Sequence, residues 1–481
     1  MKLLRNLSAA VLLMAVSAGI AYAQKWQKLT NQPTFQTDTA LLLTDGTVMM
    51  HEYCNTNWWR LTPDNTGSYL NGTWSQLASA PSNYAPLYFA SAVLPDGRVI
   101  VEGGEYNFCQ GAETPLGAIY DPTTDKWTSV NPPTGWSEIG DSPGIVLANG
   151  TFMLGQNEST QAALLNAKKL TWKATGSGKK DNFSEEGWAL LPDTTVITVD
   201  TQDTPNAEKY YRGQWINASN TIQSLSLDAE GETGPELLRP QGTLFAMGAN
   251  GAGAGHTAIY TPPAKPQQPG SWAKGPDFPN GNDMADAPAA VLPNGNVLCD
   301  TSPGVFLSPV TFYEFNGKKF LNAPSTSNPG QTSYEGRMLV LPTGQVLFAV
   351  ADGQTIDVEL YTAKGTYRKA WAPTITSVPT TLTRGSTYKA SGTQFNGLTA
   401  GAAYGDDAQM NSSYPLVRIT NTASGHVFYA RTHDPSTMGV GTGKKTVSTN
   451  FDVPSDAETG ASTLEVVANG IPSAPADVTV Q

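Results

Sequence analysis

Basic residues are scarce in this sequence, and long helical patterns are absent. Lys and Arg number 29 against 41 Asp and Glu, and the formal net charge is −12. Because binding to phosphate backbones needs a basic face, this balance argues against a nucleic-acid partner. Only 15% of the residues are charged, whereas glycine (47) and proline (34) are plentiful. This composition indicates many tight turns between short strands.

Long apolar runs are also lacking beyond the N-terminus. There, Lys2 and Arg5 precede an apolar run at residues 9–16, and a small-residue cleavage pattern (AYA) follows at residues 21–23. The run is shorter than the roughly 20 residues that a membrane span needs, which disfavours an N-terminal anchor. We therefore predict a signal peptide at residues 1–23 and a secreted protein, extracellular or periplasmic, without a membrane span.

Cysteine is rare as well, with Cys54, Cys109 and Cys299 as the three in the chain. Disulfides persist in an oxidising compartment, so three cysteines indicate one disulfide and one remaining thiol. Which two residues pair depends on the fold.

A strand–turn–strand unit recurs seven times along the chain, at intervals of about 50 residues. Each unit has two apolar strands around a short turn such as Asp-Gly or Asn-Gly, which is the strongest short hairpin signal. The seven hairpins are ALLLTDGTVMM from Ala40, SAVLPDGRVIV from Ser91, GIVLANGTFML from Gly144, WALLPDTTVITV from Trp188, ELLRPQGTLFAM from Glu236, AAVLPNGNVLC from Ala289 and MLVLPTGQVLFAV from Met338. This period predicts a seven-bladed kelch-type β-propeller over residues 24–371.

Each unit is expected to end in a fourth strand that carries an aromatic residue. Six units do so, with Trp74, Trp127, Trp172, Trp215, Trp272 and Phe320. The seventh hairpin has no clear fourth strand, whereas residues 26–29 (WQKL) form a strand without a unit. Pairing these two would close the ring and remove its open edges. We expect the aromatic residues to pack between blades rather than to bind a cofactor.

The pattern changes after about residue 371. Strands then alternate with turns rich in Gly, Pro and Asn as far as residue 481. This predicts an immunoglobulin-like β-sandwich at residues 372–481, so the whole chain is expected to be all-β. A closed ring gives no reason to require a dimer, and we expect a monomer.

Seven kelch blades followed by such a sandwich resemble galactose oxidase and glyoxal oxidase. Residues 333–342 (SYEGRMLVLP) resemble the family's Tyr-His segment ahead of its last hairpin, and residues 431–434 (RTHD) resemble its C-terminal histidine segment. The resemblance implies that residues 372–481 form an early-set domain. It also implies a copper ion on the propeller axis, held by two Tyr, two His and solvent, with one Tyr bonded to a Cys sulfur and carrying a radical.

Most of these copper-site positions differ in this chain. Tyr88 stands at the position of the cross-linked Cys, Asp141 at that of its Tyr partner, and Glu335 at that of one His. Tyr334 and His433 match the pattern. We therefore do not expect a Tyr–Cys copper-radical cofactor.

Equal offsets from the seven turns place one residue of each blade at the same height around the axis. Eight residues before the turns stand Thr37, Tyr88, Asp141, Glu185, Thr233, Asp286 and Glu335. Four of the seven are carboxylates, which repel one another unless a cation or a basic ligand group neutralises them. Alternatively, they cap backbone amides or face water.

A single metal ion, calcium or a transition metal, is one way to neutralise this acidic ring. Hard oxygen ligands favour calcium or magnesium, whereas a histidine beside a tyrosine and a carboxylate would also suit zinc, iron or copper. The candidate ligands are Tyr334, Glu335, His433 and Asp141.

The loops between the second and third strands open on the same face and form its rim. Those of blades 1 and 2 carry the aromatic residues Tyr53, Trp58, Trp59, Tyr106 and Phe108. Exposed rings beside polar groups hold sugars or extended polymers, although buried loop packing is the competing interpretation. Cys54 and Cys109 lie in these adjacent loops, whereas Cys299 lies inside a strand, so we predict a Cys54–Cys109 disulfide and a buried Cys299 thiol.

Three functions are compatible with this sequence. The first is a secreted propeller that binds a carbohydrate or another extracellular ligand at the acidic axial site, without copper-radical chemistry. The second is an enzyme at the same site, either an oxidoreductase with a mononuclear metal or a hydrolase or lyase with paired carboxylates. The third is a scaffold for protein binding or adhesion. A fold alone does not choose among them.

Overall fold

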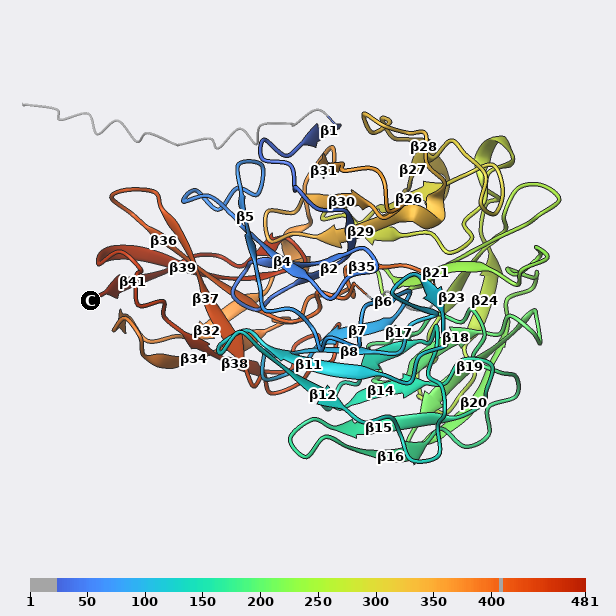
Figure 1. The fold of residues 1–481 in the computed structure, drawn as a ribbon. Coiled ribbons are helices and arrows are strands. Elements are labelled where there is room, and N and C mark those ends of the chain that lie inside the picture. Colours follow the sequence, from blue (N-terminus) through green and yellow to red (C-terminus); the bar gives the residue numbers. More distant parts are fainter. Residues whose placement is uncertain (1–23, 406–409) are drawn as a thin grey trace, which may run out of the picture.

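The structure, a computed structural model, describes residues 24–405 and 410–481. These residues form β-strands joined by turns and by three short 3₁₀ helices (Figure 1). The helices are η1 (Pro279–Gly281), η2 (Ser333–Glu335) and η3 (Lys369–Trp371). The predicted signal peptide lies outside the described residues, and within them no helix is long and apolar enough to cross a membrane.

Seven sheets follow one another along the chain, and each contains one of the seven predicted hairpins. Sheet 1 has β2 (Thr37–Leu42), β3 (Val48–Glu52), β4 (Trp58–Thr62) and β5 (Thr73–Gln76). Sheet 2 has β7 (Ala90–Val93), β8 (Val99–Glu102), β11 (Gly117–Asp121) and β12 (Lys126–Val130). Sheet 3 has β13 (Gly144–Val146), β14 (Phe152–Gly155), β15 (Ala162–Asn166) and β16 (Thr171–Thr175).

The next three sheets repeat this antiparallel order. Sheet 4 has β17 (Ala189–Leu190), β18 (Val196–Val199), β19 (Asn206–Tyr211) and β20 (Gln214–Asn220). Sheet 5 has β21 (Thr233–Leu238), β22 (Leu244–Gly248), β23 (Thr257–Thr261) and β24 (Ser271–Lys274). Sheet 6 has β25 (Ala289–Val291), β26 (Val297–Thr301), β27 (Thr311–Phe315) and β28 (Phe320–Asn322).

Sheet 7 is completed by the N-terminal strand, as predicted. It contains β29 (Gly336–Val340), β30 (Val346–Val350) and β31 (Val358–Thr362), and its fourth strand is β1 (Lys25–Lys28). β1 pairs antiparallel with β31, and Trp26 lies opposite Tyr361. This pairing joins the two ends of the seven-sheet segment, which removes two open sheet edges.

The first strands of neighbouring sheets contact one another. The contacts join β29 with β2, β2 with β7, β7 with β13, β17 with β21, β21 with β25 and β25 with β29. One cluster of buried apolar side chains joins sheets 3 and 4, since it contains Ile145 and Met153 as well as Trp188 and Leu190. Small antiparallel sheets packed side by side in this way are consistent with a β-propeller.

The fourth-strand tryptophans join the sheets by a repeated hydrogen bond. In five of them the indole N–H donates, over 2.7–3.0 Å, to a backbone carbonyl at the end of the preceding sheet. The pairs are Trp26 with Pro324, Trp74 with Asn31, Trp127 with Ala78, Trp172 with Asn131 and Trp272 with Ala218. These rings therefore pack between sheets, as the sequence predicted.

The C-terminal residues form one larger sheet with its own apolar core around Phe395, Val417 and Phe451. Its strands are β32 (Thr374–Ser377), β33 (Thr381–Leu382), β34 (Thr387–Thr393), β36 (Leu416–Asn421), β37 (Val427–His433), β38 (Val447–Asp452), β39 (Gly460–Ala468), β40 (Ile471–Pro472) and β41 (Ala476–Val480). One C-terminal strand, β35 (Ala402–Ala403), leaves this sheet and pairs with β25 of sheet 6. A small separate sheet consists of β6 (Pro86–Leu87), β9 (Tyr106–Asn107) and β10 (Gln110–Gly111).

Candidate functional site: an acidic axial cavity

Loops that precede the first strands of the sheets surround a cavity of about 610 Å³, which we call the axial cavity. Sheets 2 to 7 each contribute at least one residue from just before the first strand, and these include Tyr88, Asp141, Glu185, Glu232, Asp286 and Tyr334. Sheet 1 contributes Tyr53, from the loop after β3. All seven sheets thus contribute residues to one cavity.

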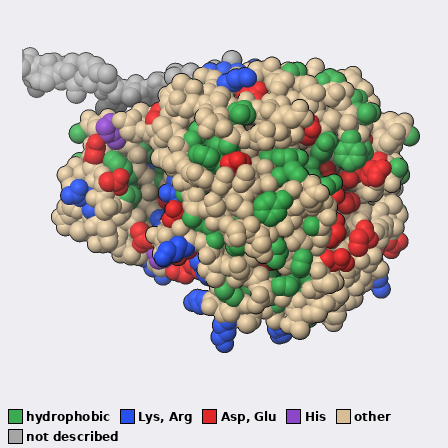
Figure 2. Space-filling view, viewed as in Figure 1, with side chains coloured by type: hydrophobic (Ala, Val, Ile, Leu, Met, Phe, Trp, Pro, Cys, Tyr) green, Lys and Arg blue, Asp and Glu red, His purple; other side chains and the backbone are tan. Residues whose placement is uncertain are grey.

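The lining of the axial cavity is strongly acidic. Its carboxylates are Glu105, Glu113, Asp141, Glu185, Glu230, Glu232 and Asp286, and its phenols are Tyr53, Tyr88, Tyr106 and Tyr334. Among the described residues, no Lys, Arg or His lines it. Asp and Glu side chains also gather on the side of the molecule away from the C-terminal sheet, at the right of Figure 2. The cavity therefore favours ligands that carry positive charge or donate hydrogen bonds.

Three of the carboxylates form a compact group. One oxygen each from Glu185, Glu232 and Asp286 lies within 4.8 Å of the other two. The three residues come from the approaches to sheets 4, 5 and 6. Hard cations such as Ca²⁺ take six to eight oxygen ligands at about 2.3–2.6 Å, so this group could supply three ligands and leave other positions to water or to a ligand.

Six residues that line the cavity have a backbone conformation that is unfavourable for side chains other than glycine. Three of them are Cys109, Glu113 and Phe306, and the other three, Tyr88, Glu185 and Asp286, lie just before the first strands of their sheets. The φ angles are 51° at Tyr88, 55° at Glu185 and 45° at Asp286. The left-handed region costs L-residues free energy, and such strain clusters at functional sites. Tyr88, Glu185 and Asp286 belong to alternate sheets (2, 4 and 6), and the conformation directs each side chain to the cavity.

A segment of the C-terminal unit reaches this cavity. After β35, the hydroxyl of Tyr404 donates to the carbonyl of Tyr334 over 2.8 Å. A Cβ on Gly405 would lie 2.5 Å from Oδ1 of Asp286, and a Cβ on Gly187 would collide with the carbonyl oxygen of Gly405. Only glycine permits these two close approaches.

A buried arginine lies directly under the tyrosines of the cavity. The guanidinium of Arg337 is 4.4 Å from the ring centre of Tyr404 and 5.5 Å from that of Tyr88. It donates to the carbonyl of Tyr334 over 2.9 Å and lies 3.4 Å from Asp38. Stacking on aromatic faces and an ion pair together stabilise a buried guanidinium. Arg337 therefore stabilises the positions of Tyr88 and Tyr334 at the cavity.

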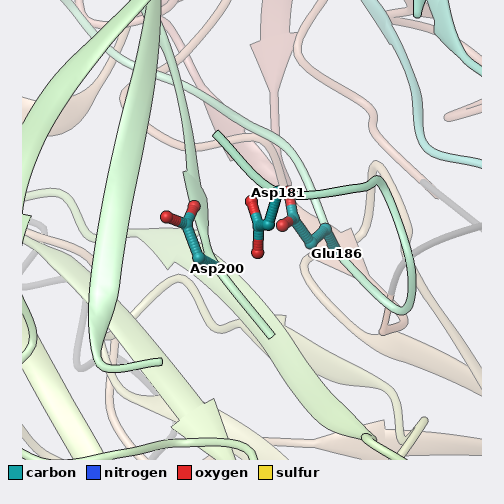
Figure 3. Close-up of side chains that lie close together, drawn as sticks. All are labelled: Asp181, Glu186 and Asp200. Carbon is teal, nitrogen blue, oxygen red and sulfur yellow. The ribbon is translucent and has the colours of Figure 1, made fainter. Parts of the chain in front are cut away.

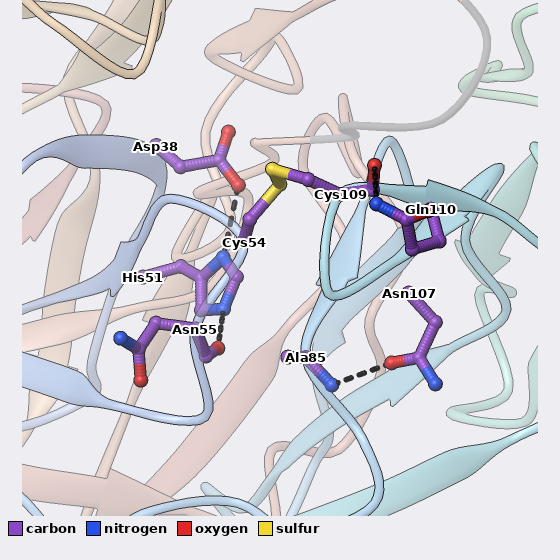
Figure 4. The surroundings of a disulfide bond; sticks show 8 residues. All are labelled: Asp38, His51, Cys54, Asn55, Ala85, Asn107, Cys109 and Gln110. Atoms are coloured by element: carbon purple, nitrogen blue, oxygen red, sulfur yellow. Dashed lines mark hydrogen bonds and ion pairs between the residues drawn. A yellow bond between two sulfur atoms is a disulfide. The ribbon is translucent and has the colours of Figure 1, made fainter.

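The ion pair continues from Arg337 to the rim of the cavity. Asp38 pairs with Nδ1 of His51 over 2.9 Å, and Nε2 of His51 lies 2.6 Å from the carbonyl of Asn55 (Figure 4). Burial alone would raise the pKa of Asp38, but the hydrogen bond with His51 and the charge of Arg337 lower it. Asp38 is therefore a charged carboxylate. Through His51 it connects Arg337, beneath the cavity, to the loop that contains Cys54.

The phenols of the cavity remain protonated at neutral pH. Burial raises the pKa of Tyr53 to about 12 and that of Tyr88 well above its usual value. Burial and the charge of Glu335 also raise the pKa of Tyr334. These hydroxyls can therefore donate hydrogen bonds to a ligand while the carboxylates accept them.

The disulfide prediction is confirmed. Cys54 and Cys109 are bonded, with their Cα atoms 5.3 Å apart, and the free Cys299 is buried (Figure 4). Cys109 itself lines the cavity. The bond ties the loop after β3 to the turn between β9 and β10, so it fixes one side of the rim.

A buried lysine behind the cavity was not foreseen from the sequence. Nζ of Lys179 lies 3.0 Å from both Glu186 and Glu208 and 3.5 Å from Asp200, and it also pairs with Asp181. Figure 3 shows Asp181, Glu186 and Asp200 close together, and one oxygen of each lies within 4.8 Å of the other two. Burial alone would lower the pKa of Lys179, but the surrounding carboxylates raise it, so the amine is charged.

Glu186 directly follows the cavity residue Glu185. Because Lys179 fixes Glu186 inside the protein, it also fixes the turn from which Glu185 points to the cavity. The lysine therefore positions the acidic cluster without touching a ligand.

The structure places most of the predicted axial residues together. Tyr88, Asp141, Glu185, Asp286 and Tyr334 all line the cavity. Two of the predicted rim residues, Tyr53 and Tyr106, line it as well. Of the seven residues at equal offsets from the hairpin turns, four thus line the cavity, whereas Thr37, Thr233 and Glu335 do not.

Two predicted ligands are not at the cavity. The carboxylate of Glu335 accepts a hydrogen bond from the backbone N–H of Thr332 and caps η2. His433 lies on β37, where its ring pairs with Asp434 and Asp452. The predicted grouping of Tyr334, Glu335, His433 and Asp141 is therefore wrong, and the C-terminal segment at the cavity is the one after β35.

The aromatic rim is also smaller than predicted. Trp58 is 1% exposed and packs against Phe89 and Trp127, so its assignment to the rim is wrong. Trp59 stacks on Phe35 with ring centres 4.5 Å apart and does not line the cavity. Phe108 is 46% exposed outside the lining.

Four carboxylates of the cavity were missed in the sequence: Glu105, Glu113, Glu230 and Glu232. They lie in loops of irregular length, where equal offsets from the turns do not apply. The acidic composition of the sequence is consistent with additional carboxylates, but it does not show where in the fold they lie.

No protein-family model matches the chain, and no curated protein matches it in sequence. Among solved structures, a fungal alcohol oxidase of the AA5 family, in complex with copper, is similar with a TM-score of 0.54. The identity is 14%, and the match covers 96% of this chain and all of that one.

Two other solved structures are more distantly similar. A streptogramin B lyase has a TM-score of 0.47 at 12% identity, over 71% of this chain and 97% of that one. The extracellular domain of a hybrid two-component system of B. thetaiotaomicron has a TM-score of 0.49 at 10% identity; the match covers 96% of this chain and 59% of that chain. At these identities the likeness concerns the fold alone. The chain thus has a galactose-oxidase-like β-propeller fold.

Proposed function

We propose that this chain is a secreted, seven-bladed kelch-type propeller, with an immunoglobulin-like early-set domain at residues 372–481, that binds an extracellular carbohydrate at the axial cavity. The seven sheets would be the blades, and the β1–β31 pairing would close the ring. Tyr88 and Asp141, at the positions of the cross-linked Cys and Tyr, leave no Tyr–Cys cofactor for radical chemistry. We expect a monomer.

The composition of the axial cavity carries this proposal. Carboxylates accept hydrogen bonds from sugar hydroxyls, and the neutral phenols of Tyr53, Tyr88 and Tyr334 can donate to them. A volume of about 610 Å³ suits a small ligand, since such sites measure roughly 300–1,000 Å³. Tyrosine rings at the wall offer apolar faces to a sugar ring.

A hard cation, Ca²⁺ by preference, is part of the proposal. The group of Glu185, Glu232 and Asp286 would hold it, and its remaining positions would accept vicinal hydroxyls of the sugar. The ion would also reduce the repulsion among neighbouring carboxylates.

Sugar binding can be tested by the shift in melting temperature and by calorimetry across a panel of neutral and amino sugars. We expect at least one sugar to bind in the presence of Ca²⁺ and to be released by a chelator. In the Glu232→Gln/Asp286→Asn variant, affinity should fall at least tenfold, which is about 1.4 kcal/mol.

The matched control is Asp477→Asn, which removes an exposed carboxylate on β41 far along the chain from the cavity lining. It should bind like the wild type. If the cavity variant binds every sugar as tightly as this control does, the proposed site is wrong.

An enzyme at the same cavity is the second candidate. The three-carboxylate group favours it, because a metal ion held by few protein ligands keeps positions open for a reacting water or substrate. Turnover of a bound sugar, lost in Glu185→Gln together with metal binding, would establish catalysis. Binding without any change in the sugar would support the binding protein.

A further inference from the structure

A second, larger groove lies between sheets 3 and 4, away from the axial cavity. Its volume is about 1210 Å³, roughly twice that of the cavity. One side is the edge strand β16 of sheet 3, and the other is the β19–β20 turn of sheet 4. Ser436, Thr437 and Lys445 of the C-terminal unit close one end. A volume above the roughly 300–1,000 Å³ of small-molecule sites indicates an extended ligand.

The charge of this groove is opposite to that of the cavity. Lys173, Arg212 and Lys445 line it with exposed side chains, and within the described part of the chain none of the three forms an ion pair. The buried Lys179 also lines it, but its charge is paired with four carboxylates. Its one lining carboxylate, Asp193, is engaged in its own turn, where Oδ1 accepts hydrogen bonds from the N–H and hydroxyl of Thr195. In a protein of net charge −12, such a basic site is a local exception.

The boundary between sheets 3 and 4 is also built differently from five others. There, the indole N–H of Trp215 is buried and has no hydrogen-bond partner among the described residues, although the equivalent tryptophans each bond to the preceding sheet. Instead, the backbone N–H of Trp215 donates to Ser177, and that of Gly176 to Gly213. Buried donors without partners are rare in proteins and call for an explanation.

Glycine at position 176 lets the backbone pack closely against the indole of Trp215. A Cβ there would lie 2.8 Å from Nε1 of Trp215. Gly176 and Gly178 both line the groove, so backbone rather than bulky side chains forms its wall next to the indole. The unused donor therefore lies beside the groove.

We propose that this groove binds an acidic polysaccharide. Arg212 lies over the ring of Tyr211, 5.1 Å from its centre, which leaves its N–H groups free to bind a carboxylate or sulfate in a bidentate manner. The hydroxyl groups of Thr160 and Ser436 and the side-chain amide of Gln161 also line the groove and can form hydrogen bonds with a polysaccharide. Since the rest of the protein repels polyanions, binding depends on this local site and weakens with salt.

The test is electrophoresis of the mature protein in native gels that contain polygalacturonate, dextran sulfate or neutral dextran. We expect polygalacturonate or dextran sulfate, but not dextran, to retard the wild type, and retardation to disappear at high salt. Whichever acidic polymer retards it identifies carboxylate or sulfate as the recognised group.

Variants locate the binding. Lys173→Glu/Lys445→Glu should weaken it at least tenfold, whereas Lys274→Glu/Lys318→Glu, with the same charge change at exposed positions outside the groove, should not. Unchanged melting temperatures would show that both variants fold.

Three results would overturn the proposal: no retardation by either acidic polymer, equal retardation by dextran, or equal losses in the two double variants. The axial variant Asp286→Asn should keep the retardation, so the groove and the cavity are tested separately.

Discussion

Replacing Lys179 with Met is expected to lower the free energy of unfolding by about 3–5 kcal/mol at neutral pH. The amine is fully buried, and four carboxylates lie within ion-pair distance of it. Met has a similar length but no charge, so it would leave the charged members of this buried acidic group without their cation. Urea denaturation of the two proteins measures the difference.

Lys180→Met is the matched control, because the side chain of Lys180 is exposed. It should change stability by less than about 0.5 kcal/mol, as expected for a surface position. A Lys179→Met protein as stable as this control would contradict the role given to the buried lysine.

The loss should depend on pH. Burial raises the pKa of Asp200 to about 8, even though Lys179 opposes the shift, and it also raises the pKa of Glu186. A carboxyl whose pKa is raised in the folded state contributes stability below its unfolded value near 3.8, and this contribution disappears as pH rises towards 8. Without Lys179 these groups bind protons more tightly still. The two proteins should therefore differ less at about pH 5 than at about pH 8.

Breaking the Cys54–Cys109 disulfide is expected to lower the free energy of unfolding by about 4 kcal/mol. The bond joins residues 55 positions apart, and closing a loop of this length removes about that much chain entropy from the unfolded state. The Cys54→Ser variant should therefore melt at a lower temperature. Since Cys109 lines the axial cavity, sugar binding should weaken as well.

The double variant Cys54→Ser/Cys109→Ser serves as the control for this effect. Both changes remove the same bond, so it should lose as much stability as the single variant, and the losses should not add. Full stability in the double variant would show that the bond does not hold the rim.

The sequence was most informative where the chain is regular. A tight turn between two apolar strands, such as Asp45-Gly46, leaves little freedom in register, so the hairpins were found at the predicted places. The same regularity identified β1 as the strand that completes sheet 7 and placed Cys54 next to Cys109.

The sequence was least informative in the loops at the cavity. Before sheet 7, the side chain of Glu335 caps the start of η2. As a result Tyr334, and not Glu335, lines the cavity. Glu232 lies close to Glu185 and Asp286 because the irregular loop before β21 places a further carboxylate next to the position that equal offsets predict. Such loops follow tertiary contacts rather than a period.

Long-range placement was also out of reach. His433 matched a short motif, yet it lies on β37, and a different segment, through Tyr404, reaches the axis. The position of a residue on a predicted strand does not show which loop of the C-terminal unit enters the cavity. Lys179 was missed for a similar reason, because its four partners come together only in the folded chain.

The most direct test of the axial site is a crystal structure of the mature protein soaked in terbium chloride together with the sugar that binds best. Tb³⁺ takes the place of Ca²⁺ and is located by its anomalous scattering. We predict one strong peak bonded to carboxylate oxygens of Glu185, Glu232 and Asp286 at about 2.3–2.6 Å, with sugar hydroxyls completing its coordination. A cavity with neither peak nor sugar, in crystals where the sugar is bound elsewhere, would contradict the proposed function.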